Sequence, residues 1–173
     1  MTQELIDLRN SILAGRYADA LAIVDELEGM SRQAILRNIQ AFLRILLIHL
    51  IKNQLEQRLT HSWVASIRNS VTEIKRLNLK DNKKSYYVNL DEWENLILEE
   101  VIEEAIANAS EEVLNGAYNQ FQLGEMVDKT DLVQTALKFL HLTYEHSAKT
   151  LPAAIAEVLI QLPGGENWMN RKN

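Results

Sequence analysis

The feature that most constrains this chain is a long apolar stretch in its first third. The segment from Ser31 to Gln54, SRQAILRNIQAFLRILLIHLIKNQ, contains neither glycine nor proline, and its part from Phe42 to Ile51 is interrupted by only two polar residues. A helix that is apolar nearly all round is buried on most sides. The sequence therefore predicts a central helix here, with Ser31 as its N-cap after Gly29 and Met30.

This stretch does not have the pattern of a membrane span. Its apolar run of ten residues is well short of the ~20 that a bilayer crossing requires. Its polar side chains are spaced by four, three and four residues and form one stripe; they are Gln33, Arg37, Gln40 and Arg44. The remaining surface is free to be covered by other helices, so we expect a helical bundle and no membrane.

Helical periodicity recurs along the rest of the chain, and no stretch alternates with the period of two that is typical of a half-buried strand. We expect further helices over approximately 2–14, 17–27, 62–77, 91–106, 131–145 and 153–162, with the clearest loop at 78–89. Residues 110–124 are expected to hold a short helix and a turn, without fixed limits between them. Asp91 and Glu94 have capping-box spacing, Thr130 or Asp131 is the expected cap of the next helix, and Pro152 suits a first turn. The predicted fold is all-α: a single-domain bundle of about six to eight helices over residues 1–165, with 166–173 as a frayed tail.

Length and composition narrow the class of protein. A chain of 173 residues can bury about 70% of the surface that it exposes when unfolded, so it needs no disulfides to stabilise a core. It has no cysteine, which is compatible with a reducing cytosol and removes thiolate chemistry. The first residues, MTQELIDLRN, lack the basic and apolar regions of a secretory signal. We therefore expect a cytoplasmic protein.

Charge is segregated along the chain. From Lys52 to Lys84 there are eight basic and three acidic residues, a net charge of +5, whereas 85–128 holds eleven acidic residues and no lysine or arginine, a net charge of -11. One interpretation is that helices from the two blocks complement each other across the bundle. The other is that one block recruits a partner of opposite charge.

Four local patterns resemble the largely cyanobacterial family known as domain of unknown function number twenty-nine. They are LAGRY from Leu13, DELEGMS from Asp25, LRILLIHLIK from Leu43 and EQRLTHSWVASI from Glu56. Within them, His-Leu-x-Lys occurs at 49–52 and Ser-Trp-x-x-Ser-Ile at 62–67. The resemblance covers roughly the first half of the chain and implies a compact helical protein; it implies no activity.

Several hydrogen-bond donors gather at the connection after the central helix. They are His49, Lys52, Arg58, His61, Ser62, Trp63 and Arg68. The free backbone N–H groups and the dipole at the start of a helix attract anions, so these residues form a candidate site for a phosphate or a carboxylate. The structural alternative is that Ser62 caps its helix while Trp63 packs on the preceding helix.

Signatures of catalysis and of metal binding are missing from the sequence. No Glu-x-x-His, His-Glu-x-x-His or Gly-x-Ser-x-Gly pattern occurs, and no glycine-rich phosphate loop precedes a helix. Glu99, Glu100, Glu103 and Glu104 form i, i+4 pairs without a nearby histidine, which is typical of a solvated face. We expect no catalytic residues, no metal and no cofactor.

These observations rank the functional classes. We favour a non-catalytic helical module that acts through an unknown protein partner, and self-association is compatible with the sequence. The alternative is anion or nucleic-acid binding through the basic block 52–84, where Tyr86 and Tyr87 could stack on bases. The acidic block makes nucleic acid an improbable partner, and an enzyme ranks third.

Overall fold

The computed structural model describes residues 1–171, and the regular structure in them is helical, which confirms the all-α prediction. The α-helices are α1 Gln3–Leu13, α2 Tyr17–Glu56, α3 His61–Asn78, α4 Trp93–Leu96, α5 Ile102–Ser110, α6 Gln120–Met126, α7 Lys129–Glu145, α8 Leu151–Gln161 and α9 Gly165–Met169. Short 3-10 helices lie at Leu90–Glu92 and Val113–Gly116, and a π-helical turn lies at Ile97–Val101. The chain divides into two compact units, Met1–Asn38 and Ile39–Asn173. The prediction of one domain over 1–165 stays a prediction.

The first unit consists of α1 and the beginning of α2. The chain turns back at Gly15, whose φ of +74° is in the left-handed region, and the Arg16 N–H donates to the Ser11 carbonyl at 2.8 Å. Ser11 and Ala20 are its buried residues. Most of its other side chains are exposed, so this helical hairpin has very little core of its own.

The expected break between a helix over 17–27 and a central helix from Ser31 is wrong, because α2 continues through Gly29 to Glu56. A glycine ends a helix when it adopts a positive φ, and Gly29 does not. Glycine inside a helix costs only about 1 kcal/mol relative to alanine, which good helix formers on both sides can offset. Ser31 is therefore an ordinary helical residue.

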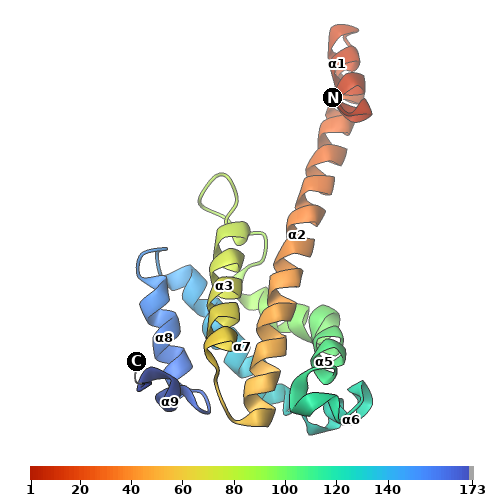
Figure 1. Ribbon diagram of the computed structural model, residues 1–173. Helices are drawn as coiled ribbons and strands as arrows, with labels where there is room; N and C mark the ends of the chain where they lie inside the picture. The colour runs from red at the N-terminus through yellow and green to blue at the C-terminus, as the bar shows by residue number, and fades with distance from the viewer. Residues whose placement is uncertain (172–173) are drawn as a thin grey trace. The chain divides into compact units, whose positions relative to one another are not determined.

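The second unit is built around the C-terminal half of α2, which confirms the predicted central apolar helix. Its fully buried side chains are Ile39, Leu43, Leu46, Leu47, Leu50 and Ile51. Figure 1 shows α3 and α8 on one side of this half-helix and α5 and α6 on the other. Helix α7 packs against α3, α4 and α8, so the half-helix is covered by the later parts of the chain.

Helix α2 is long and apolar enough to cross a membrane, when it is judged by length and composition alone. A core helix of a protein that never enters a membrane passes the same test. From Ile39 to Ile51, six apolar residues of α2 are buried, whereas Phe42 and Ile48 are half-buried and Ile45 is exposed. The expectation that no membrane is involved stays a prediction.

The loop expected at 78–89 is present, and its two ends are tied together. The buried side chain of Asn78 donates to the Val88 carbonyl at 2.9 Å and accepts from the Val88 N–H at 2.7 Å. Leu79 and Tyr86 form an isolated bridge. After the loop the cap is formed by Asn89 with Glu92, and the predicted box at Asp91 and Glu94 is wrong.

The segment after α5 differs from the short helix and turn expected there. It forms a 3-10 turn in which Leu114, Asn115 and Gly116 all have positive φ values, 51°, 59° and 67°. Asn119 then caps α6, and Asp128 caps α7 by accepting from the Asp131 N–H, so neither Thr130 nor Asp131 is the cap.

The C-terminal segment is helical where a frayed tail was expected. Helix α9 follows α8 after a turn at Gly164, and its Trp168 is only 7% exposed. The buried Asn53 side chain donates to the Pro163 carbonyl at 2.8 Å and to the Arg58 carbonyl at 3.0 Å. These bonds attach the turn before α9 to the end of α2. Residues 172 and 173 of the expected tail lie outside the described residues.

Candidate functional site

Three of the seven predicted site residues meet at the end of α2 and the start of α3. The Lys52 ammonium lies 5.8 Å from the centre of the Trp63 ring, and the Arg58 guanidinium carbon lies 4.7 Å from it. A cation within about 6 Å of an indole ring is attracted by the electron density of the ring. Trp63 is buried, so it forms a fixed platform between the two cations.

Carboxylates that were not among the predicted site residues occupy both cations. Lys52 pairs with Glu112, and Arg58 pairs with Glu56 at 2.9 Å. The other oxygen of Glu56 accepts from the Leu114 N–H at 3.3 Å, in the turn of left-handed residues. An anionic ligand would therefore have to displace these glutamates. The charge of the acidic block signalled the pairing of Lys52 with Glu112, whereas Glu56 lies within the basic block and had no such signal.

The ion pairs also bear on how the two charged blocks interact. Lys52 with Glu112 joins the basic block to the acidic block, whereas Arg58 and Arg76 pair with Glu56 and Glu73 inside the basic block. Complementarity between the blocks thus operates at the end of α2. For the rest of the basic block, both sequence interpretations remain open.

The start of α3 is capped by Thr60 and not by Ser62. The Thr60 hydroxyl accepts a hydrogen bond from the Trp63 N–H at 3.2 Å. The Ser62 hydroxyl lies 3.2 Å from the Thr60 hydroxyl. His61 and Ser62 are exposed at this helix start. The Thr60 side chain already satisfies one of the backbone donors that an anion would use.

Neither His49 nor Arg68 forms an ion pair with the described residues. The Nδ1 atom of His49 lies 2.8 Å from the Ile45 carbonyl, one turn earlier in α2. Burial lowers the pKa of His49, and the nearby Lys52 adds to that effect. The Nε atom of Arg68 is buried without a hydrogen-bond partner in the described part of the chain. Neither residue contacts an anion-binding group.

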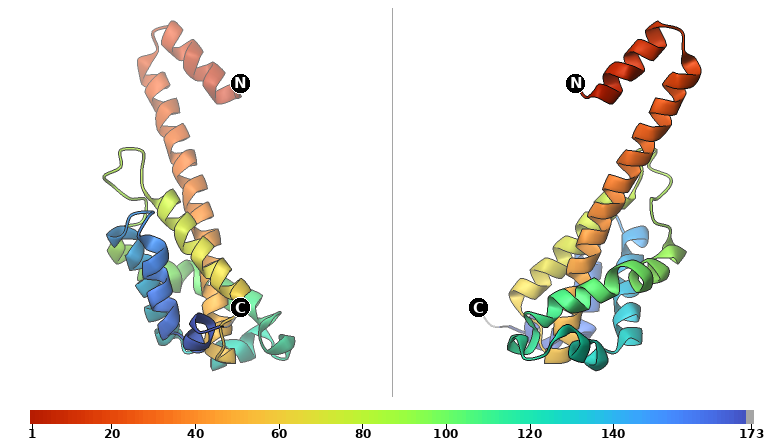
Figure 2. Two further views of the ribbon diagram at one scale, coloured as in Figure 1. Left: turned by 60° about the vertical axis from the view of Figure 1, so that its left-hand side comes forward. Right: turned by 90° about the vertical axis from the view of Figure 1, so that its right-hand side faces the viewer.

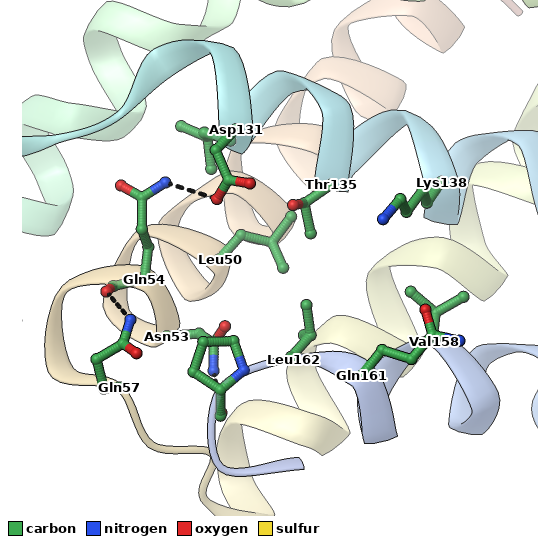
Figure 3. A pocket seen from close by; sticks show the side chains of 12 residues that line it. Leu50, Asn53, Gln54, Gln57, Asp131, Thr135, Lys138, Val158, Gln161 and Leu162 are labelled. Carbon is green, nitrogen blue, oxygen red and sulfur yellow. Dashed lines mark hydrogen bonds between the residues drawn. The ribbon is translucent and has the colours of Figure 1, made fainter.

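A pocket that was not predicted from the sequence opens between α2, α7 and the end of α8 (Figure 3). Its volume is about 240 Å³; the buried Leu50 and Leu132 line it, and Thr135 and Lys138 point in from α7. Gln54 donates to Asp131 at 3.2 Å and both donates to and accepts from the Asp128 backbone at 3.0 Å. The amide groups at its edge are thus largely satisfied by the protein itself.

A wider groove of about 750 Å³ lies beside the loop at 78–89. Tyr86, Leu137 and His141 line it, together with Tyr144 and two acidic residues, Asp91 and Glu94. Burial raises the pKa of Tyr144 to about 12. At neutral pH its hydroxyl is protonated and donates to the Val88 carbonyl at 2.6 Å, so it is not available as a base.

The described residues hold no arrangement with a clear catalytic role. Residues 1–171 contain no group of three or more histidine or carboxylate side chains placed to hold a metal ion. The cluster at Trp63 has cations and carboxylates that neutralise each other, and the pocket in Figure 3 has amides without a nucleophile and base in contact.

Comparison with known proteins gives one finding. The model of a family described as "Domain of unknown function DUF29" matches residues 16–140. The match includes the cluster at Trp63 and most of α7, and it extends well beyond the first half of the chain, where the sequence motifs lie. Neither the curated proteins nor the solved structures contain a significant match.

Proposed function

Since the chain belongs to the family of the domain of unknown function DUF29, whose description names no activity, we propose a function from the surface of the protein itself: a cytoplasmic, non-catalytic helical module that acts through protein–protein contacts. The observation that carries this proposal is the exposure of apolar side chains on α1 and the first part of α2. Soluble proteins rarely leave large contiguous apolar patches uncovered unless they bind something.

The distribution of exposed apolar residues is strongly uneven. Of seventeen exposed large apolar side chains in the described residues, nine lie in residues 1–38. They are Met1, Leu5, Ile6, Ile12, Leu13, Tyr17, Leu21, Val24 and Met30. Because the only buried apolar residue of this unit is Ala20, folding of the hairpin alone gains little from apolar burial. A protein partner would supply the missing contacts.

The experiment is an affinity purification of the full chain from native lysate at low and high ionic strength, with and without nuclease. The double variant Leu21→Glu/Val24→Glu places two charges on the exposed face of α2, and Leu98→Glu is the control, a leucine of similar exposure in the second unit. We expect a stoichiometric protein that survives high salt, is lost with the double variant and is kept with the control. Equal recovery with both variants would refute a role for this face.

The alternative function is anion or nucleic-acid binding through the basic block 52–84. The pairing of Lys52, Arg58 and Arg76 with glutamates argues against it. Lys75 is also engaged, since its ammonium donates to the Thr143 carbonyl at 2.9 Å. Phosphate contacts weaken steeply with salt, so nucleic acid that elutes at high ionic strength would favour this alternative.

A further inference from the structure

We propose that the partner of the apolar face of α2 is a second copy of this chain, which packs antiparallel to the first through residues 17–35. This inference rests on the proposed function and names the partner that covers the apolar face of α2. Three observations carry it: the spacing of the exposed residues, the charge pattern around them and the area that they leave uncovered.

One face of α2, exposed except at the half-buried Ile35, has the spacing of a coiled-coil seam. Steps of four and three residues alternate along one face; its members are Tyr17, Leu21, Val24, Glu28, Ser31 and Ile35. Tyr17 and Leu21 are 66% and 64% exposed, so nothing within the unit covers this face. Alternation of four and three keeps one stripe facing a partner helix over many turns.

The charges around the seam specify antiparallel pairing. Three charged side chains lie at or beside the seam: Asp25 and Glu28 in its first half and Arg32 in its second, while Asp19, Glu26 and Arg37 lie on the opposite face of the helix. A parallel pair would place the acidic first half of this segment beside the acidic first half of the other copy. An antiparallel pair centred near Glu28 places Leu21 beside Ile35 of the other copy and Asp25 beside its Arg32. The two Glu28 side chains then meet at the two-fold axis, and their repulsion is set against the two symmetric contacts between Asp25 and Arg32. A two-fold axis repeats each contact, as an isologous interface requires.

Helix α1 adds an apolar border to this seam. Met1, Leu5, Leu8 and Ile12 line a shallow apolar hollow on one face of α1. The buried Ser11 and Ala20 mark where the two helices meet. Around each helix axis, the hollow on α1 and the seam on α2 are displaced in the same rotational sense from the surface where the two helices meet. In an antiparallel hairpin, this displacement puts the hollow and the seam on the same side of the helix pair. Figure 2 shows α1 turning back from the start of α2 and diverging from it toward the N-terminus.

The uncovered area fits a small dimer interface. A complete Leu, Ile, Val or Met side chain presents roughly 60–120 Å² of apolar surface, as its transfer free energy implies. The exposed parts of Met1, Leu5, Ile12, Tyr17, Leu21 and Val24 therefore amount to on the order of 200–400 Å² per copy. An interface at the lower end of the specific range buries ~600 Å² per partner, of which about 60% is apolar. The two areas agree.

The test is the mass of the full chain in solution, measured by light scattering and sedimentation from about 1 μM to about 200 μM, because a dimer depends on concentration. We expect the mass to rise from 19.8 kDa toward twice that value. Leu21→Glu/Val24→Glu should remain monomeric at every concentration, and Leu98→Glu should behave like the unchanged chain. Circular dichroism of each variant establishes that its helices are intact.

Charge reversal tests the register of the pairing. Arg32→Glu places a carboxylate beside Asp25 of the other copy. We expect the affinity of the dimer to fall at least about tenfold, which corresponds to a modest loss of binding free energy. The exchange Asp25→Arg/Arg32→Glu restores opposite charges at both symmetric contacts and should recover dimerisation. Failure of the exchange to rescue would overturn the antiparallel register.

Other outcomes separate this inference from the function on which it rests. A monomer at all concentrations, or a dimer that ignores the seam variants, overturns the second copy as occupant. If the same seam variants still lose a different, salt-resistant protein in the affinity purification, the interaction function stands without the dimer. If they lose nothing there either, both proposals fail.

Discussion

The hydroxyl group of Tyr144 joins three segments of the second unit. It accepts from Trp93 Nε1 at 2.6 Å and from Asn78 Nδ2 at 3.1 Å, and it donates to the Val88 carbonyl at 2.6 Å. Trp93 is fully buried, so Tyr144→Phe leaves its indole N–H without an acceptor. A buried donor without a partner costs about 1–3 kcal/mol. We expect the free energy of unfolding in urea to fall by that amount, while Tyr118→Phe, at an exposed tyrosine, leaves it unchanged.

His49 provides a prediction about pH. Burial lowers the pKa of this imidazole in the folded protein below its ordinary value of 6.5, which the unfolded chain keeps. The unfolded chain therefore binds a proton at a higher pH, and the stability contributed by neutral His49 is complete above about pH 6.5 and is lost as the pH falls toward the folded pKa.

Nuclear magnetic resonance of the histidine rings checks this directly. The His49 signals should titrate with a midpoint below 6.5. The loss of stability on acidification should be smaller in His49→Gln than in the unchanged chain. A midpoint at or above 6.5 for His49 would contradict the assigned burial.

For single residues, the sequence analysis predicted part of the candidate site. It placed Lys52, Arg58 and Trp63 together, because the spacing puts them on either side of one connection. It could not reveal that Glu56 and Glu112 neutralise the cations, since Glu112 comes from a turn whose left-handed residues follow from tertiary packing. Whether an anion ever replaces these glutamates stays a prediction.

Gly165 in α9 and Gly29 in α2 differ in whether the surrounding structure has room for a Cβ atom. A Cβ atom at Gly165 would overlap the carbonyl oxygens of Leu159 and Ile160, whereas one at Gly29 would meet nothing within 4 Å. We expect Gly165→Ala to displace α9 and destabilise the protein by about 1–3 kcal/mol, the usual cost of overpacking. Gly29→Ala should stabilise α2 by about 0.5–1 kcal/mol.

Thermal unfolding followed by circular dichroism measures both effects, and tryptophan fluorescence reports whether Trp168 leaves its buried site in Gly165→Ala. The paired substitutions control for each other, because each adds one methyl group. If Gly29→Ala destabilised the chain instead, the continuous helix through that residue would be in doubt.

The elements show where sequence reasoning works and where it does not. Apolar periodicity found the helices, because burial of one face decides whether a helix forms. The caps were wrong by two or three residues at Thr60, Asn89 and Asp128, since each start holds several residues that can cap. Tertiary contacts select among them. The attachment of α9 through Asn53 depends on residues 110 positions apart, which periodicity cannot detect.

Across the whole molecule, the two units differ in what stabilises them. Apart from Ala20, every buried apolar residue in the described chain lies at or after Ile39. The second unit therefore contains nearly all of the buried apolar core, whereas the first has almost none of its own. We expect a fragment of residues 39–173 to fold by itself with a cooperative urea transition, because truncation removes almost none of the buried apolar surface that stabilises it.

The measurement is the urea transition and the solution mass of the fragment beside those of the full chain. The fragment should remain monomeric at concentrations where the full chain associates, because it lacks the seam on α2. A fragment of 39–173 carrying Tyr144→Phe is the control, and it should show the same loss of stability as the full-length variant if the core is unaltered. A broad, non-cooperative transition of the unchanged fragment would show instead that residues 1–38 are required for the core to fold.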